Sequence, residues 1–141
     1  MDVPPFDDQL RKPQEMEPAL RSQLVLVVDD EPEVRSVLTE ILAAAGYDVI
    51  VACDGEEALE AVRTHAPGLM ITDLVMPRKE GLETIREARQ LAPGMKIIAI
   101  SGAFGNRFLT VATHLGAHAA LAKPFSADVL LSTIRGVRVN G

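Results

Sequence analysis

The sequence predicts an α/β fold in which a doubly wound, five-stranded parallel sheet is covered by helices on both faces. Five short apolar runs alternate with five stretches of helix-like periodicity along most of the 141 residues. The apolar runs are largely continuous, which is typical of parallel strands that are buried on both faces. With 48% hydrophobic residues the chain can bury one core, so we expect a single globular domain.

The first half of the chain predicts two strand–helix units. Leu24–Val28 is a Val-rich strand, and Pro32 suits the first turn of the helix that follows it. That helix carries apolar residues at three- and four-residue spacing until Gly46 ends it. Tyr47–Ala52 predicts the second strand, and Asp54 is placed to cap the second helix.

The second half predicts three further units of the same kind. The expected strands are Leu69–Asp73, Lys96–Ile100 and a weaker fifth run, Ala117–Ala122. The expected helices are Leu82–Leu91, Asn106–Leu115 and a last one that Ser126 caps. Strict alternation of strands and helices favours right-handed crossovers and a doubly wound sheet.

Polar residues stand where four of these strands end, and they are Asp29, Asp30, Asp73, Ser101 and Lys123. Because parallel strands end at one edge of a sheet, and ligands bind there, we expect these side chains to converge. Clustered carboxylates repel by about 4 kcal/mol per pair at ~4 Å and a dielectric constant near 20, so they need a cation. Oxygen ligands without Cys or His favour Mg²⁺. A carboxylate nucleophile beside a hydroxyl and an ammonium then predicts phosphoryl chemistry.

Composition excludes several classes of protein. A net charge of −6 without a basic run argues against nucleic-acid binding. No apolar run has the length of a membrane span, and no signal peptide is recognisable, so we expect a cytoplasmic protein without membrane contact. The single cysteine, Cys53, excludes an internal disulfide, and we expect it to be a buried small hydrophobe.

The predicted domain is flanked by short tails. Residues 1–23 are rich in proline and charged residues, which predicts a flexible N-terminal tail. We expect the domain to span residues 24–137 and a C-terminal tail to span residues 138–141. The sequence after the last predicted helix is too short for a second domain. We therefore expect the output to come from the surface of this domain.

Four motifs in this order resemble the receiver domain of response regulators in two-component signalling. They are Val27–Pro32 (VVDDEP), Ile71–Pro77 (ITDLVMP), Ile100–Gly102 (ISG) and Lys123–Phe125 (KPF). The resemblance covers about residues 24–137. It implies a (βα)5, flavodoxin-like fold of the CheY type with strand order 2-1-3-4-5, here as a stand-alone domain.

The resemblance also implies a role for each polar residue. Asp73 would accept a phosphoryl group from a histidine kinase or a histidine phosphotransfer protein. Asp30, Asp73 and the backbone carbonyl of Val75 would bind Mg²⁺ directly, and Asp29 through a metal-bound water. Such a domain is a signalling phosphoacceptor that catalyses only its own phosphorylation and dephosphorylation.

Two further residues would hold the phosphoryl group. The resemblance implies that Ser101 hydrogen-bonds to it and that Lys123 pairs with it electrostatically, next to a cis Lys123–Pro124 peptide bond. Output would then pass to an unknown protein target, and the face made by the fourth helix, fifth strand and fifth helix would allow a homodimer.

Other interpretations stay open at this stage. Asp29 and Asp30 could simply cap the helix that begins near Pro32. The chain could be a degenerate receiver that binds partners without phosphorylation, although the acids and Lys123 are all present. A small Mg²⁺-dependent phosphatase of the haloacid dehalogenase type is less favoured because Val75 stands where its second Asp would be. Flavin binding is less favoured because the first loop carries acids instead of a phosphate-binding sequence.

The sequence departs from the family pattern at the usual aromatic switch position, which is Ala120. Without that aromatic rotor, signal transmission needs another route. One hypothesis uses Phe104 and Phe108, which would move with the Ser101 loop. Another uses the charged loop Arg78–Gly81 as the contact with a partner. Val75 and Ala103, two residues after the acceptor and the hydroxyl, cannot orient a water, which predicts a long-lived phosphoryl group.

Overall fold

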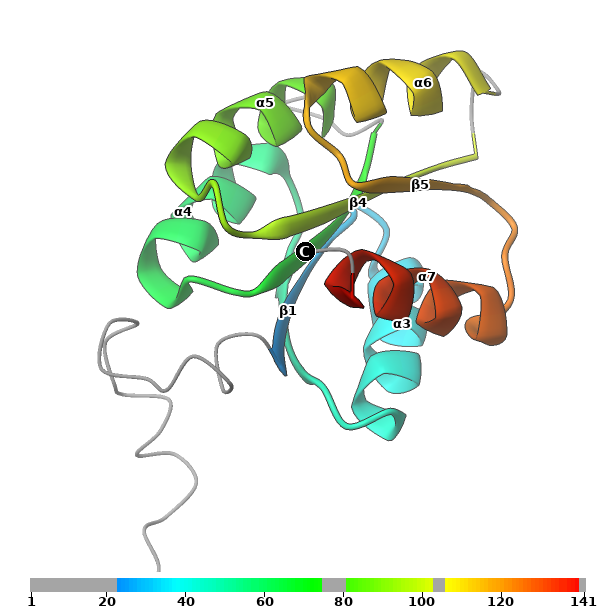
Figure 1. Cartoon of the computed structure of the whole chain (residues 1–141). Helices are drawn as coiled ribbons and strands as arrows, with labels where there is room; N and C mark the ends of the chain where they lie inside the picture. The colour runs from blue at the N-terminus through cyan, green and yellow to red at the C-terminus, as the bar shows by residue number, and fades with distance from the viewer. Residues whose placement is uncertain (1–22, 75–80, 103–105, 140–141) are drawn as a thin grey trace, which may run out of the picture.

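A computed structural model describes residues 23–74, 81–102 and 106–139, and these form a parallel sheet flanked by helices (Figure 1). The strands are β1 (Leu24–Val28), β2 (Asp48–Ala52), β3 (Leu69–Asp73), β4 (Lys96–Ser101) and β5 (Ala119–Ala122). The helices are α3 (Pro32–Ala44), α4 (Gly55–His65), α5 (Gly81–Leu91), α6 (Asn106–Leu115) and α7 (Ala127–Val139). The five strands lie in the order β2-β1-β3-β4-β5, which confirms the predicted doubly wound fold.

The sheet is covered on both faces, which explains why its strands are continuously apolar. Helices α3 and α7 lie on one face, and α4, α5 and α6 lie on the other (Figure 1). In β1, Val25 and Val27 pack in the first layer, whereas Leu26 and Val28 pack in the second. All four side chains are fully buried. The core therefore consists of two apolar layers with the sheet between them.

The two predicted caps are confirmed. Asp54 Oδ1 accepts a hydrogen bond of 2.8 Å from the backbone N–H of Glu57 at the start of α4. Ser126 Oγ accepts a bond of 3.1 Å from the N–H of Val129 in α7. Both side chains satisfy helix amides that have no partner within the helix.

Several boundaries differ from the prediction by one or two residues. Strand β2 starts at Asp48 because the N–H of Tyr47 still bonds to the Leu42 carbonyl and closes the end of α3. Strand β5 starts at Ala119, since the N–H of Ala117 bonds to the Ala112 carbonyl of α6. Helix α5 begins at Gly81, one residue earlier than predicted, and β4 continues one residue further, to Ser101. Helix α7 continues to Val139, whereas the predicted domain ends at residue 137.

The prediction for Cys53 is wrong. Its side chain is only partly buried, and Sγ donates a hydrogen bond of 3.2 Å to a carboxylate oxygen of Glu57. This hydrogen bond, with partial desolvation and the charges of Glu57 and Asp54, raises the pKa of the thiol. Cys53 is therefore a polar member of the loop between β2 and α4.

Some predicted features fall outside the described residues: the tail 1–22, Val75, the loop residues Arg78–Glu80, Ala103, Phe104 and the last two residues. The side chain of Phe108 is likewise outside what the structure describes. Within the described ranges, no helix has the length and apolar character needed to cross a bilayer.

Candidate functional site

The strand register brings the predicted site residues to one level of the sheet. Asp29 directly follows Val28, which is aligned with Thr72 of β3, so Asp29 and Asp73 occupy equivalent positions on neighbouring strands. Ser101 is the last residue of β4 and is aligned with Ala122, the residue before Lys123. The Lys123 N–H also bonds to the Ser101 carbonyl over 2.9 Å. Convergence at the carboxyl edge is therefore a consequence of parallel pairing.

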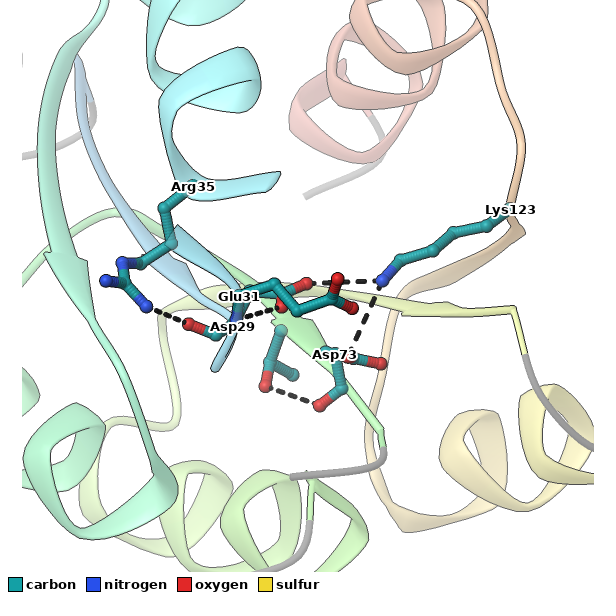
Figure 2. A network of polar contacts seen from close by, with 6 residues as sticks. Asp29, Glu31, Arg35, Asp73 and Lys123 are labelled. Atoms are coloured by element: carbon teal, nitrogen blue, oxygen red, sulfur yellow. Dashed lines mark hydrogen bonds and ion pairs between the residues drawn. The ribbon is translucent and has the colours of Figure 1, made fainter. Parts of the chain in front are cut away.

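Lys123 connects the two acidic strand ends. Its Nζ atom lies 3.3 Å from Asp29 Oδ2 and 3.5 Å from Asp73 Oδ2 (Figure 2). The side chains are 24% exposed for Lys123, 8% for Asp73 and fully buried for Asp29, so water screens these ion pairs weakly. Burial disfavours the ammonium, but Asp73 and Asp29 together outweigh it and raise the pKa of Lys123.

Asp29 is the most buried acid at this edge, and the loop around it satisfies its polar atoms. Its Oδ1 accepts the Glu31 N–H over 2.9 Å, and its backbone carbonyl accepts Arg35 Nη1 over 2.7 Å. Helix α3 begins with Pro32, and within the described residues its N-cap position has no side-chain capping bond. The Asp29 carboxylate therefore binds Lys123 and the loop backbone, and it does not serve as the N-cap of α3.

The acids at the end of β1 form a group of oxygen ligands. Carboxylate oxygens of Asp29, Asp30 and Glu31 lie within 4.8 Å of one another. Oxygen-only donors in this number suit a hard divalent cation such as Mg²⁺, which keeps several waters and takes a few carboxylates. Asp73 lies outside this group but at the same edge, where it shares the Lys123 ammonium with Asp29. The residues present therefore fit a magnesium site.

Two glycines keep the backbone close to this edge. A Cβ atom on Gly81 would collide with the Asp73 carbonyl oxygen and with the Leu74 backbone, and the Gly81 N–H bonds to the Leu74 carbonyl over 3.0 Å. A Cβ atom on Gly102 would lie 3.3 Å from the Lys123 Cβ atom. Gly81 thus allows α5 to approach the end of β3, and Gly102 allows Lys123, which follows β5, to approach the end of β4.

Sequence reasoning missed three residues of this site. The sequence places Glu31 only within the VVDDEP motif and Gly81 only in the charged loop Arg78–Gly81, and it gives Arg35 no role. The acidic Glu31 directly after the acidic pair was the one available signal. The contacts of Arg35 and Gly81 are with backbone atoms of Asp29, Asp73 and Leu74, and such contacts leave no motif in a sequence.

Ala120 occupies the predicted switch position in the middle of β5. It is aligned with Ala99 of β4, is partly buried, and packs against the layer of α4, α5 and α6. A methyl group has no rotamers to exchange. The described residues therefore offer no side-chain rotor at this position.

A five-stranded, doubly wound sheet whose carboxyl edge combines buried acids with a partly buried lysine is typical of a receiver-type signalling domain. The family model of the response regulator receiver domain matches residues 25–135, and the chain belongs to this family. Response regulators receive phosphoryl groups from histidine kinases, so the chain is a signalling domain of two-component systems and not a classical enzyme.

Relatives with known sequences agree with this assignment. The chain is 33% identical over 113 residues to the alkaline phosphatase synthesis transcriptional regulatory protein PhoP of Bacillus subtilis, covering 80% of the chain and 47% of the relative. It is 36% identical over 118 residues to the probable transcriptional regulator ycf27 of Porphyridium aerugineum, covering 84% and 49%. The chain thus spans about half the length of the curated relatives it matches.

Solved structures match the whole domain. The chemotaxis protein CheY4 of Vibrio cholerae superposes with a TM-score of 0.77 at 30% identity, covering 82% of this chain and 98% of CheY4. The receiver domain of NtrX from Brucella abortus gives a TM-score of 0.77 at 31% identity, covering 80% and 96%. The fold is that of CheY-like receivers.

Proposed function

We propose that this domain is a phosphoacceptor in a two-component phosphorelay and that Asp73 is the residue that takes the phosphoryl group. The observation that carries the proposal is the position of Lys123, whose ammonium lies between the carboxylates of Asp73 and Asp29. A lysine held there by charge is available to an incoming phosphoryl oxygen at the same place.

The proposed transfer starts from a phosphohistidine on a histidine kinase or a histidine phosphotransfer protein. An Asp73 carboxylate oxygen attacks phosphorus and forms the P–O bond, the P–N bond breaks, and its electron pair stays on the histidine nitrogen, which takes up a proton from water and leaves as neutral imidazole. Lys123 exchanges its contact with Asp73 for one with a phosphoryl oxygen. Ser101, buried at the end of β4, donates its hydroxyl hydrogen to another.

Mg²⁺ would neutralise the charge that builds up on the phosphoryl oxygens during the transfer. We propose Asp29, Asp30, Asp73 and the backbone carbonyl of Val75 as the residues that hold it. The buried Asp29 carboxylate supports its place in this set, since a fully buried acid needs a compensating cation. Lys123 supplies one positive charge, and a divalent ion would supply the rest.

The output of the domain is also a proposal, because the curated relatives are about twice as long as the matched region. Both relatives named above are transcriptional regulators by name. For this chain we propose output by protein–protein contact from the domain surface, with Ala120 requiring a route other than an aromatic rotor.

The direct test is phosphorylation by acetyl phosphate with Mg²⁺, followed by intact mass spectrometry. Wild type should gain one phosphoryl group, and Asp73→Asn should gain none. Asp48→Asn is a matched control, since Asp48 is an exposed acid at the opposite end of the sheet, and it should behave as wild type. Equal labelling of Asp73→Asn would overturn the proposal.

The same samples separate the alternatives. A degenerate receiver would stay unlabelled in every variant. A phosphatase would release phosphate over many turnovers from an unrelated phosphomonoester, whereas a receiver should not.

A further inference from the structure

Glu31 occupies the N-cap position of helix α3 without acting as its cap. Within the described residues, no side-chain capping bond is made there, and Pro32 at the next position has no N–H to offer. An acidic residue at a helix N-terminus ordinarily serves that helix. Its side chain is directed elsewhere in this protein.

The Glu31 carboxylate faces the site of Asp29, Lys123 and Asp73. Figure 2 shows the side chain extending from the loop toward these groups, and its oxygen lies within 4.8 Å of those of Asp29 and Asp30. Two hydrogen bonds of the Glu31 backbone fix the position from which this side chain extends. The Glu31 N–H donates to Asp29 Oδ1 over 2.9 Å, and the Glu31 carbonyl accepts the Arg35 N–H over 3.1 Å.

The turn that carries Glu31 is also tied to the sheet. Arg35 Nη1 donates to the Asp29 carbonyl over 2.7 Å, so the first turn of α3 is held against the end of β1. The Asp29 N–H in turn bonds to the Ala52 carbonyl of β2 over 3.2 Å. The backbone position from which the Glu31 side chain extends is therefore set by the same contacts that place Asp29.

We infer that Glu31 is a fourth carboxylate of the cation site, beside Asp29, Asp30 and Asp73, and that it strengthens Mg²⁺ binding and slows reaction with strongly anionic phosphodonors. This inference rests on the proposed function. Among the described residues, this edge carries four carboxylates, those of Asp29, Asp30, Glu31 and Asp73, and one ammonium, that of Lys123, which pairs with Asp29 and Asp73. One divalent cation leaves the site with a negative charge, which attracts the metal and repels a dianionic donor.

The first test is isothermal titration of Mg²⁺ into wild type, Glu31→Gln and Glu33→Gln. Glu33 is the matched control because it is an exposed acid in the first turn of the same helix but outside the ligand group. Glu31→Gln should raise the dissociation constant roughly three- to tenfold, the size expected for one partly screened charge near a dication. Glu33→Gln should change it less than twofold or so. Equal shifts in both variants, or none in Glu31→Gln, would overturn the inference.

The second test measures phosphorylation at saturating Mg²⁺. Acetyl phosphate carries more negative charge than phosphoramidate, so Glu31→Gln should accelerate the first reaction roughly two- to fivefold and the second less. Unchanged acetyl phosphate rates would overturn the part of the inference that concerns the donor. Wild-type labelling separates the two levels: a labelled wild type with an unshifted Glu31→Gln refutes only the role of Glu31, and an unlabelled wild type refutes the proposed function.

Discussion

Two strand ends of this domain carry groups of side chains that could bind a metal, and they are built differently. At the end of β1 the group is Asp29, Asp30 and Glu31, and at the end of β2 it is Cys53, Asp54 and Glu57. Both lie at the carboxyl edge, and in both the ligand atoms lie within 4.8 Å of one another. Composition and compactness therefore do not distinguish them.

Their hydrogen bonds do distinguish them. In the β2 group, Asp54 accepts the Glu57 N–H, and the Glu57 carboxylate accepts both the backbone N–H and Sγ of Cys53, so every such partner lies within four residues. In the β1 group, Asp29 binds Lys123, which is 94 residues away in the chain. An acid that caps its own helix already has a structural role. An acid that contacts a lysine far away in the sequence has no such local role, because only the fold brings the two residues together. The proposed chemistry therefore belongs to the β1 group, whereas the hydrogen bonds of the β2 group stabilise the start of α4.

The largest expected effect is on the rate of phosphorylation, and it tests Lys123, the distant partner of Asp29. Lys123→Met should lower the rate of Asp73 phosphorylation about 100-fold, because one preorganised cation at the phosphoryl oxygens is lost. The initial rate of labelling by acetyl phosphate measures it. Lys96→Met is the control, since Lys96 begins β4 at the opposite edge of the sheet. A wild-type rate in Lys123→Met would show that the contact with Asp73 has no catalytic consequence.

The next largest effect is on the free energy of unfolding, and it tests Asp54 in the β2 group. Asp54→Ala should lower the free energy of unfolding by about 1 kcal/mol, the usual loss for an N-cap, and leave the Mg²⁺ dissociation constant unchanged. Urea unfolding and calorimetric titration provide the two values. If the Mg²⁺ affinity fell as well, the distinction between the two strand ends would fail.

A smaller effect concerns the thiol in that local group. Because the hydrogen bond to Glu57 is the largest cause of the raised pKa of Cys53, Glu57→Gln should lower this pKa and increase the thiolate fraction at neutral pH. Alkylation by iodoacetamide near pH 7.5 should become roughly two- to fivefold faster. Val51→Ala, a change at an exposed strand position close to Cys53, is a control that should leave the rate as it is. Slower alkylation in Glu57→Gln would contradict the assigned cause.

The fold and much of the site could be predicted from the sequence because both depend on periodic, local signals. Continuous apolar runs gave the buried strands, and the polar residue after each run gave Asp29, Asp73 and Lys123 at one edge. The cis Lys123–Pro124 bond, expected from the family resemblance, is also confirmed. The metal-binding and phosphoacceptor roles of these residues stay predictions.

The errors have a common physical origin in contacts that do not follow a period. The sequence predicts a hydrophobic role for Cys53 because an isolated cysteine between an apolar strand and an acid gives no sign of its partner Glu57. The predicted start of β5, at Ala117, is two residues too early because alanines suit a strand and a helix end equally well, and the Ala117 N–H bonds to the Ala112 carbonyl of α6. Such choices are decided by individual hydrogen bonds where a strand or a helix ends, and the hydrophobic period does not encode them.

The smallest expected effect lies at the amino edge of the sheet, where His118 replaces a regular strand contact. The His118 N–H donates to the Ile97 carbonyl over 2.7 Å, and the Ile97 N–H donates back to His118 Nδ1 over 3.1 Å. Partial burial, with the positive charges of Lys96 and Arg89 nearby, lowers the pKa of His118. Protonation at Nδ1 would remove the acceptor of the Ile97 N–H.

The sign of the resulting pH dependence follows from this lowered pKa. Between the unfolded value near 6.5 and the lower folded value, the unfolded chain binds more protons, so the contribution of His118 to stability is full above about pH 6.5 and decreases as pH falls. Urea midpoints at pH 7.5 and 5.5 should therefore differ less in His118→Asn than in wild type. Mg²⁺ affinity at pH 7.5 should be the same in both, because this contact lies at the edge opposite the acids. An equal pH response would mean that Nδ1 is not the acceptor, and a changed Mg²⁺ affinity would mean that the two edges of the sheet are coupled through β5.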